Sequence, residues 1–98
     1  MTTISNVPFA VACREPSKGD PKWYVEVPDM DGVFSSGDTQ EEAIENLIEA
    51  FKNHTLSNPL TVEQLLMIDS MHHMWSPGYQ GFSFKVTSAE LTVDAPAA

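Results

Sequence analysis

The chain has 98 residues, 42% of them hydrophobic, and a formal net charge of −9 at pH 7. A chain of this length supports one small hydrophobic core, and this share of apolar residues excludes a wholly disordered protein. The negative charge opposes binding to the phosphate backbone of nucleic acids and favours a basic protein partner. The composition therefore predicts a single globular domain, residues 1–98, that makes no direct contact with nucleic acid.

No segment of the sequence predicts export or membrane insertion. The N-terminal run MTTISNVPFAVAC has no basic residues before its apolar part. No run approaches the roughly 18 apolar residues that span a bilayer. The single cysteine, Cys13, cannot form an internal disulfide, and its place in an apolar alternation predicts a buried thiol rather than a nucleophile. We therefore expect a cytoplasmic protein.

Three segments with alternating apolar residues predict an antiparallel meander. Residues 7–13 place apolar side chains on one face and small side chains on the other. The polar run that follows contains Pro and Gly and predicts a hairpin loop. Residues 23–27 alternate again until Pro28, which removes a backbone donor. A turn at Gly32 then allows a third strand at residues 33–36.

The strongest helix signal starts at Thr39. Apolar residues recur at i, i+3, i+4 and i+7 from Ile44 to Phe51, which is typical of an amphipathic helix. Thr39 and Glu42 have the spacing of a capping box, in which each side chain accepts a backbone N–H at the helix start. We therefore predict a helix that ends near residue 53.

A second helix is predicted from Thr61 to about Met74, after a break at Asn58-Pro59. Thr61 and Gln64 have the spacing of another capping box. The apolar residues of this segment occupy most sides of a helix, so one packed face cannot bury them. A helix held between its own sheet and the C-terminal segment is the alternative to an exposed patch. We predict a homodimer or higher oligomer whose interface contains Met67, Met71, Met74 and Trp75.

The last predicted element is a strand at residues 82–87, which the run AELTV extends or follows. Residues 93–98 are expected to form a disordered tail. Together these elements predict an α+β fold, a small antiparallel sheet in the order β-β-β-α-(α)-β with the helices on one face.

The acidic residues are concentrated between residues 15 and 50, where ten of them face only two lysines. Capping explains the acids of the first helical turn, but not Glu45 and Glu49. Like charges four residues apart on a helix are unfavourable by roughly 0.2–0.5 kcal/mol per pair. An acidic surface that serves solubility alone is the alternative. We predict a partner-binding surface made of Asp29, Asp31, Glu41, Glu45 and Glu49.

The sequence contains no convincing catalytic or metal site. Asp29 and Asp31 precede Gly32 as in a calcium loop, but the later ligands of such a loop are missing. His72 and His73 would point about 100° apart on a helix, and no third ligand stands four residues away. No catalytic triad pattern and no glycine-rich phosphate loop is found. We therefore predict a protein that is not an enzyme and binds neither a metal nor a cofactor.

The run YVEVPDMDGVFSSGDTQEEAIENLIEAF, from Tyr24 to Phe51, resembles the N-terminal domain of HicB-type antitoxins. That family combines a strand, a Pro-Asp-x-x-Gly turn, a second strand and a Gly-x-Thr-x-x-Glu-Ala helix start. The resemblance covers roughly residues 7–53 and implies a partial ribonuclease-H-like fold that lacks the nuclease's catalytic acids. The pattern is matched here by Pro28, Asp29, Gly32, Gly37, Thr39, Glu42 and Ala43.

The resemblance implies a non-catalytic acidic protein that neutralises a small basic toxin ribonuclease of the HicA type by covering its active histidine. Family members usually continue into a DNA-binding domain, and we expect none in this chain. The alternative is a stand-alone phage-type inhibitor of a host nucleic-acid-binding defence complex, built on the same scaffold. A short basic reading frame beside the gene favours the toxin pair, whereas neighbouring phage genes favour the inhibitor.

Overall fold

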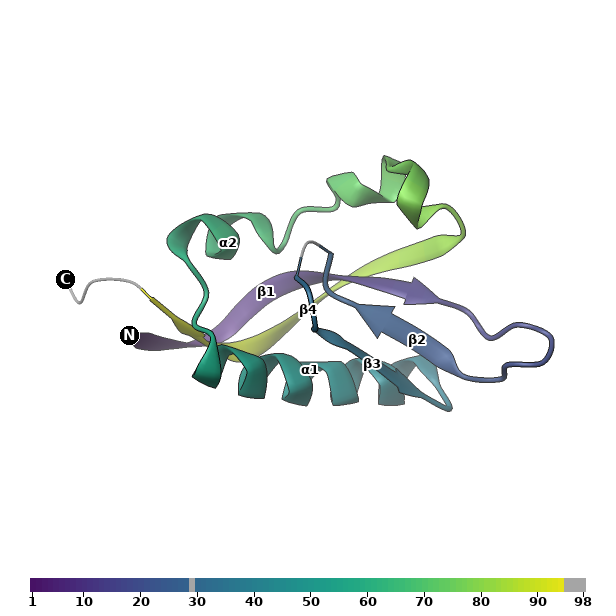
Figure 1. Ribbon diagram of the computed structural model, residues 1–98, viewed down its shortest axis with the longest axis horizontal. Coiled ribbons are helices and arrows are strands. Elements are labelled where there is room, and N and C mark those ends of the chain that lie inside the picture. The colour runs from purple at the N-terminus through teal and green to yellow at the C-terminus, as the bar shows by residue number, and fades with distance from the viewer. Residues whose placement is uncertain (29, 95–98) are drawn as a thin grey trace.

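The computed structural model describes residues 1–28 and 30–94. The α+β class expected from the sequence is confirmed, with one antiparallel sheet among the described residues (Figure 1). Its elements in chain order are β1 (Thr2–Arg14), β2 (Trp23–Glu26), β3 (Phe34–Gly37), α1 (Gln40–Ser57), α2 (Val62–Met67), the 3₁₀ turns η1 (His72–Trp75) and η2 (Pro77–Tyr79), and β4 (Phe82–Val93).

The strands lie in the order β3-β2-β1-β4. β1, β2 and β3 form the predicted meander, and β4 pairs with the other edge of β1. The β1–β4 ladder runs from the pair of Thr2 with Val93 to the pair of Arg14 with Phe82. A bulge interrupts this ladder near Asn6, whose φ of 57° lies in the left-handed region that asparagine tolerates. β1 is therefore longer than predicted, and with β2 it is one of the two inner strands of the sheet.

Helix α1 packs on one face of the sheet through the predicted apolar stripe. Ala43, Leu47 and Phe51 are fully buried. The Phe51 ring meets the Phe9 ring of β1 edge to face, with 4.9 Å between the centroids. At the helix start, the Thr39 hydroxyl accepts a hydrogen bond from the Glu42 backbone N–H at 3.0 Å, which confirms the Thr39 half of the predicted capping box. The apolar period thus sets both the position and the rotation of α1.

The start of α1 lies unusually close to the end of β3. A Cβ atom added to Gly37 would stand 2.6 Å from the backbone nitrogen of Ala43. Real Cβ atoms do not approach a backbone atom this closely, so a side chain at this position would push the helix away from the strand. Glycine is therefore required here by the close packing of α1 on β3.

The predicted continuous helix from Thr61 to Met74 is wrong. The capping box of Thr61 and Gln64 is present, but α2 ends at Met67. The Ile68 carbonyl accepts a hydrogen bond from the Ala10 backbone N–H at the edge of β1, so it does not serve the helix. The His72 backbone N–H, which would bond that carbonyl in a longer helix, points instead to the Ser70 hydroxyl. A tertiary contact therefore ends the helix early.

The segment from α2 to η2 lies on the side of the sheet opposite α1 (Figure 1). Phe84 pairs with Ala12, and both point away from the face that carries Phe9. Tyr79 of η2 packs against the rings of Phe82 and Phe84 on this second face. In place of two helices on one face, the sheet therefore has α1 on one face and a broken helical segment across part of the other.

The fourth strand is longer than its strongest signal, because the run AELTV extends it to Val93. Val93 is fully buried and pairs with Thr2. The backbone N–H of Asp94 donates to the Leu60 carbonyl at 2.7 Å. The disordered tail predicted for residues 93–98 therefore does not begin at 93, and residues 95–98 lie outside the described residues.

Gly37→Ala should destabilise the fold by roughly 1–3 kcal/mol, because the new methyl group must displace the start of α1. The matched control is Gly78→Ala, since Gly78 also has no positive φ and a Cβ there meets nothing within 4 Å. Urea unfolding followed by circular dichroism measures both changes. Equal stability of the two variants would contradict the close contact.

Candidate functional site

The exposed side of α1 carries an acidic row, defined as Glu41, Glu45 and Glu49. The buried stripe faces the sheet, so these three side chains point to solvent. None of them forms an ion pair within the part of the chain that the structure describes. Asn46 lies on the same side and donates from Nδ2 to the Ser36 carbonyl at 3.0 Å. The acidic row is therefore held on a helix that is fixed to β3.

The structure does not bring Asp31, one of the two predicted turn acids, into this row. Asp31 is exposed in the turn between β2 and β3, whereas α1 begins after the other end of β3. The turn is closed by backbone hydrogen bonds from Met30 to Val27 and from Val33 to Met30. Asp29 lies outside the described residues. Of the four predicted partner-binding residues that the structure describes, the three glutamates share one surface and Asp31 lies apart from them.

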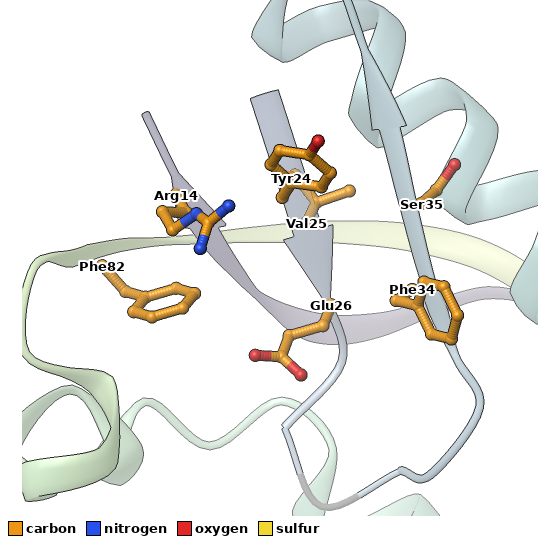
Figure 2. A pocket seen from close by; sticks show the side chains of 7 residues that line it. All are labelled: Arg14, Tyr24, Val25, Glu26, Phe34, Ser35 and Phe82. Carbon is orange, nitrogen blue, oxygen red and sulfur yellow. The ribbon is translucent and has the colours of Figure 1, made fainter. Parts of the chain in front are cut away.

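A hollow that the sequence did not indicate lies on the sheet face opposite α1. We call it the sheet-face hollow, and its volume is about 200 Å³. It is lined by side chains from all four strands (Figure 2). The strands bring together Arg14, Tyr24, Val25, Glu26, Phe34, Ser35 and Phe82.

Arg14 and Tyr24 form one side of this hollow. They are paired across β1 and β2, and the Arg14 guanidinium lies over the Tyr24 ring, 4.8 Å from its centroid. The Tyr24 hydroxyl donates a hydrogen bond to the Asp20 carboxylate at 2.8 Å. This hydrogen bond raises the pKa of Tyr24, and desolvation and the charge of Asp20 act in the same direction.

Glu26 and Phe34 form the opposite side. They are directly paired across β2 and β3, so both point away from α1. Phe34 is 70% exposed, which is high for a phenylalanine, and Glu26 is half-buried. In the sequence, the alternation of Tyr24 and Glu26 with apolar residues indicates that both lie on one face of a strand. Its link to Phe34 and Phe82 required the strand register.

Three of the four predicted oligomer residues are exposed, and the four do not form one helix face. Met67 belongs to α2 and is 56% exposed. Met74 and Trp75 belong to η1 and are 44% and 83% exposed, while Met71 is half-buried between the two elements. A second hollow of about 300 Å³ lies under α2, between Met67 and Met30. These apolar side chains therefore form an uneven surface on two short elements.

The histidine pair and the cysteine singled out in the sequence have structural roles. His72 and His73 stack with 3.9 Å between ring centroids, and His72 Nδ1 bonds the Ser70 hydroxyl. The described residues contain no cluster of three or more groups that could hold a metal ion. Cys13 is fully buried, and this burial raises the pKa of its thiol. Within residues 1–28 and 30–94, no helix is long and apolar enough to cross a membrane.

Comparison with known proteins links the chain to bacterial antitoxins. The family described as HicB_like antitoxin of bacterial toxin-antitoxin system matches residues 9–95. The N-terminal domain of the antitoxin HicB from Burkholderia pseudomallei has a similar structure, with a TM-score of 0.60 and 27% sequence identity. This match covers 86% of the present chain and 99% of the other. No match to a curated protein was found. The resemblance seen in the sequence is confirmed.

Replacing the hydrogen-bond acceptor of Tyr24 should lower its pKa. Asp20→Asn removes the carboxylate that favours the neutral phenol, so the phenolate should form at lower pH. Asp38→Asn is the control, because Asp38 is exposed and is not among the causes of the shift. The pKa of Tyr24 is measured from the absorbance of the phenolate during alkaline titration. All variants carry Tyr79→Phe, which leaves Tyr24 as the single tyrosine. An unchanged titration would contradict the assignment.

Proposed function

Because this chain belongs to the HicB-like antitoxin family of bacterial toxin–antitoxin systems, we propose that it binds and covers a small basic toxin ribonuclease of the HicA type without catalysis of its own. The acidic row on α1 is the observation that carries this proposal. Glu41, Glu45 and Glu49 repel one another, and Lys52, the cation that follows them on α1, forms no ion pair with them among the described residues. A basic partner would remove that repulsion on binding.

The net charge supports recognition of a basic partner over distance. A charge of −9 on so small a chain attracts a basic protein and can raise its association rate by roughly 10- to 1,000-fold. Screening limits this attraction to about 8 Å at physiological salt, so close contacts must complete the complex. The acidic row supplies such contacts, and we expect Asp31, in the turn before β3, and Asp29 to contact the partner apart from this row. Inhibition then follows from occlusion of the toxin's active site, in the cytoplasm.

We also propose that the chain forms a homodimer or higher oligomer through the surface of Met67, Met71, Met74 and Trp75. Large exposed apolar side chains on a small protein mark contact surfaces. Methionine suits such contacts because its side chain adapts to different neighbours. This surface lies on the opposite side of the sheet from α1, so an oligomer leaves the acidic row free.

Reversing two charges of the acidic row should slow association with the basic partner by roughly tenfold at low salt and flatten its salt dependence. The test variant is Glu45→Lys with Glu49→Lys. The control is Glu15→Lys with Glu90→Lys, which makes the same change of charge at exposed positions away from α1. Stopped-flow mixing measures the rates, with the basic protein that co-purifies with this chain from its native host as partner.

Equal effects of the two double variants would show that only net charge matters and would remove the role of the acidic row. The identity of the co-purified protein separates a toxin ribonuclease from a subunit of a defence complex.

Light scattering of the purified chain should give at least twice the mass of 10.8 kDa at micromolar concentration. Met74→Glu with Trp75→Glu should lower that mass to the monomer value, because both side chains are exposed in the single chain. Leu56→Glu, at an exposed apolar position on α1, is the control. A monomeric wild-type chain contradicts the oligomer, and an oligomer that survives the double change uses another surface.

A further inference from the structure

The sheet-face hollow combines aromatic walls with one carboxylate. Figure 2 shows the Glu26 side chain between the rings of Phe82 and Phe34. These three side chains come from β2, β4 and β3, so the antiparallel register holds them on one face. Drug-sized ligands occupy pockets of roughly 300–1,000 Å³, whereas this hollow measures about 200 Å³. Its size therefore fits one long side chain better than a small-molecule ligand.

The charge of Glu26 has no partner in the described residues. The carboxylate is half-buried and forms neither a hydrogen bond nor an ion pair there. Arg14 lines the same hollow, but its guanidinium lies over the Tyr24 ring. A carboxylate that is partly removed from water and bordered by aromatic rings binds a cation more strongly than a fully solvated carboxylate does.

We propose that the sheet-face hollow receives an arginine or lysine side chain of the basic partner, with Glu26 pairing with its charged group and the rings of Phe34 and Phe82 packing on its stem and head. This inference rests on the proposed function, because it takes the partner to be basic. Arginine fits best, since a guanidinium can form two parallel bonds to a carboxylate and stack on a ring. Arg14 on Tyr24 already shows such stacking in this hollow.

A basic partner suits this site better than a second copy of the chain. The chain has 14 acidic residues and only 5 lysines and arginines, so a second copy offers few cations to Glu26. The hollow and α1 are both connected to the same edge strand, β3. β3 is an edge strand that presents Phe34 to the hollow, and Ser36 of the same strand is bonded to Asn46 of α1. A partner along this edge therefore reaches both the hollow and α1.

The effect of replacing Arg14 distinguishes a cationic occupant of the hollow from an anionic one. Its positive charge repels an incoming arginine and attracts an incoming carboxylate. Arg14→Gln should therefore strengthen binding of a cationic side chain about two- to fivefold, whereas it would weaken binding of an acidic one. Glu26→Gln should act in the opposite direction and weaken binding of a cation about tenfold, as expected for the loss of a charge-assisted hydrogen bond.

The first experiment titrates the isotope-labelled chain with N-acetyl-arginine amide and follows backbone amide shifts by NMR. Shifts should centre on residues of the hollow, decrease in Glu26→Gln and increase in Arg14→Gln. Glu90→Gln is the matched control, because it removes one exposed carboxylate that does not line the hollow. N-acetyl-norleucine amide tests whether the charge is needed. The inference is overturned if the two probes bind equally well. It is also overturned if the Glu26→Gln variant binds the arginine probe as the wild type does, or if the Arg14→Gln variant binds it more weakly.

The second experiment measures affinity for the co-purified basic protein. Glu26→Gln should speed dissociation about tenfold, whereas Glu45→Gln should mainly slow association, since a buried pair acts after encounter and an exposed charge acts before it. If the partner binds Glu26→Gln as it binds the wild type, the hollow is not used and the proposed function stands. If no basic protein binds the wild type, the proposed function fails, and the arginine titration alone then decides whether the hollow takes a cation.

Discussion

The close approach of α1 to the sheet is the contact on which the remaining features depend. Gly37 leaves no room for a side chain beside Ala43, so the helix start lies directly against β3. Further along the helix, Phe51 packs on Phe9 of β1. These two contacts set the rotation of α1 about its axis, because the helix can bury its stripe in only one orientation. The acidic row faces solvent as a consequence.

The sheet then has two unlike faces, and each offers a different kind of surface. The face under α1 is filled by apolar side chains and carries no site. The opposite face is covered in part by the segment from α2 to η2 (Figure 1). The sheet-face hollow also lies on this opposite face (Figure 2). β3 connects the two, since Phe34 points to one face and α1 packs on the other. β3 therefore borders both surfaces.

In the segment after α1, the helix propensity of the sequence competes with burial of side chains in the core. Thr61 and Gln64 start a helix as their spacing predicts. Ile68 is drawn into the core, and its carbonyl completes the hydrogen bonding of β1 at Ala10. Leaving the backbone N–H of Ala10 without a hydrogen-bond partner would destabilise the fold more than a few further helical residues would stabilise it. The helix therefore ends, and the Ile68 carbonyl accepts from Ala10. The methionines that follow are left on two short elements and stay exposed.

The sequence by itself determined what depends on near neighbours in the chain. It predicted the α1 stripe, the cap at Thr39, the meander of three strands and the family resemblance, because periods and caps act within a few residues. Only the tertiary structure decided the sheet-face hollow, which joins Arg14 to Phe82 through a ladder between distant segments. The end of α2 at Met67 was likewise decided by β1. Strand register and long-range hydrogen bonds depend on how distant segments meet, and no local pattern encodes that choice.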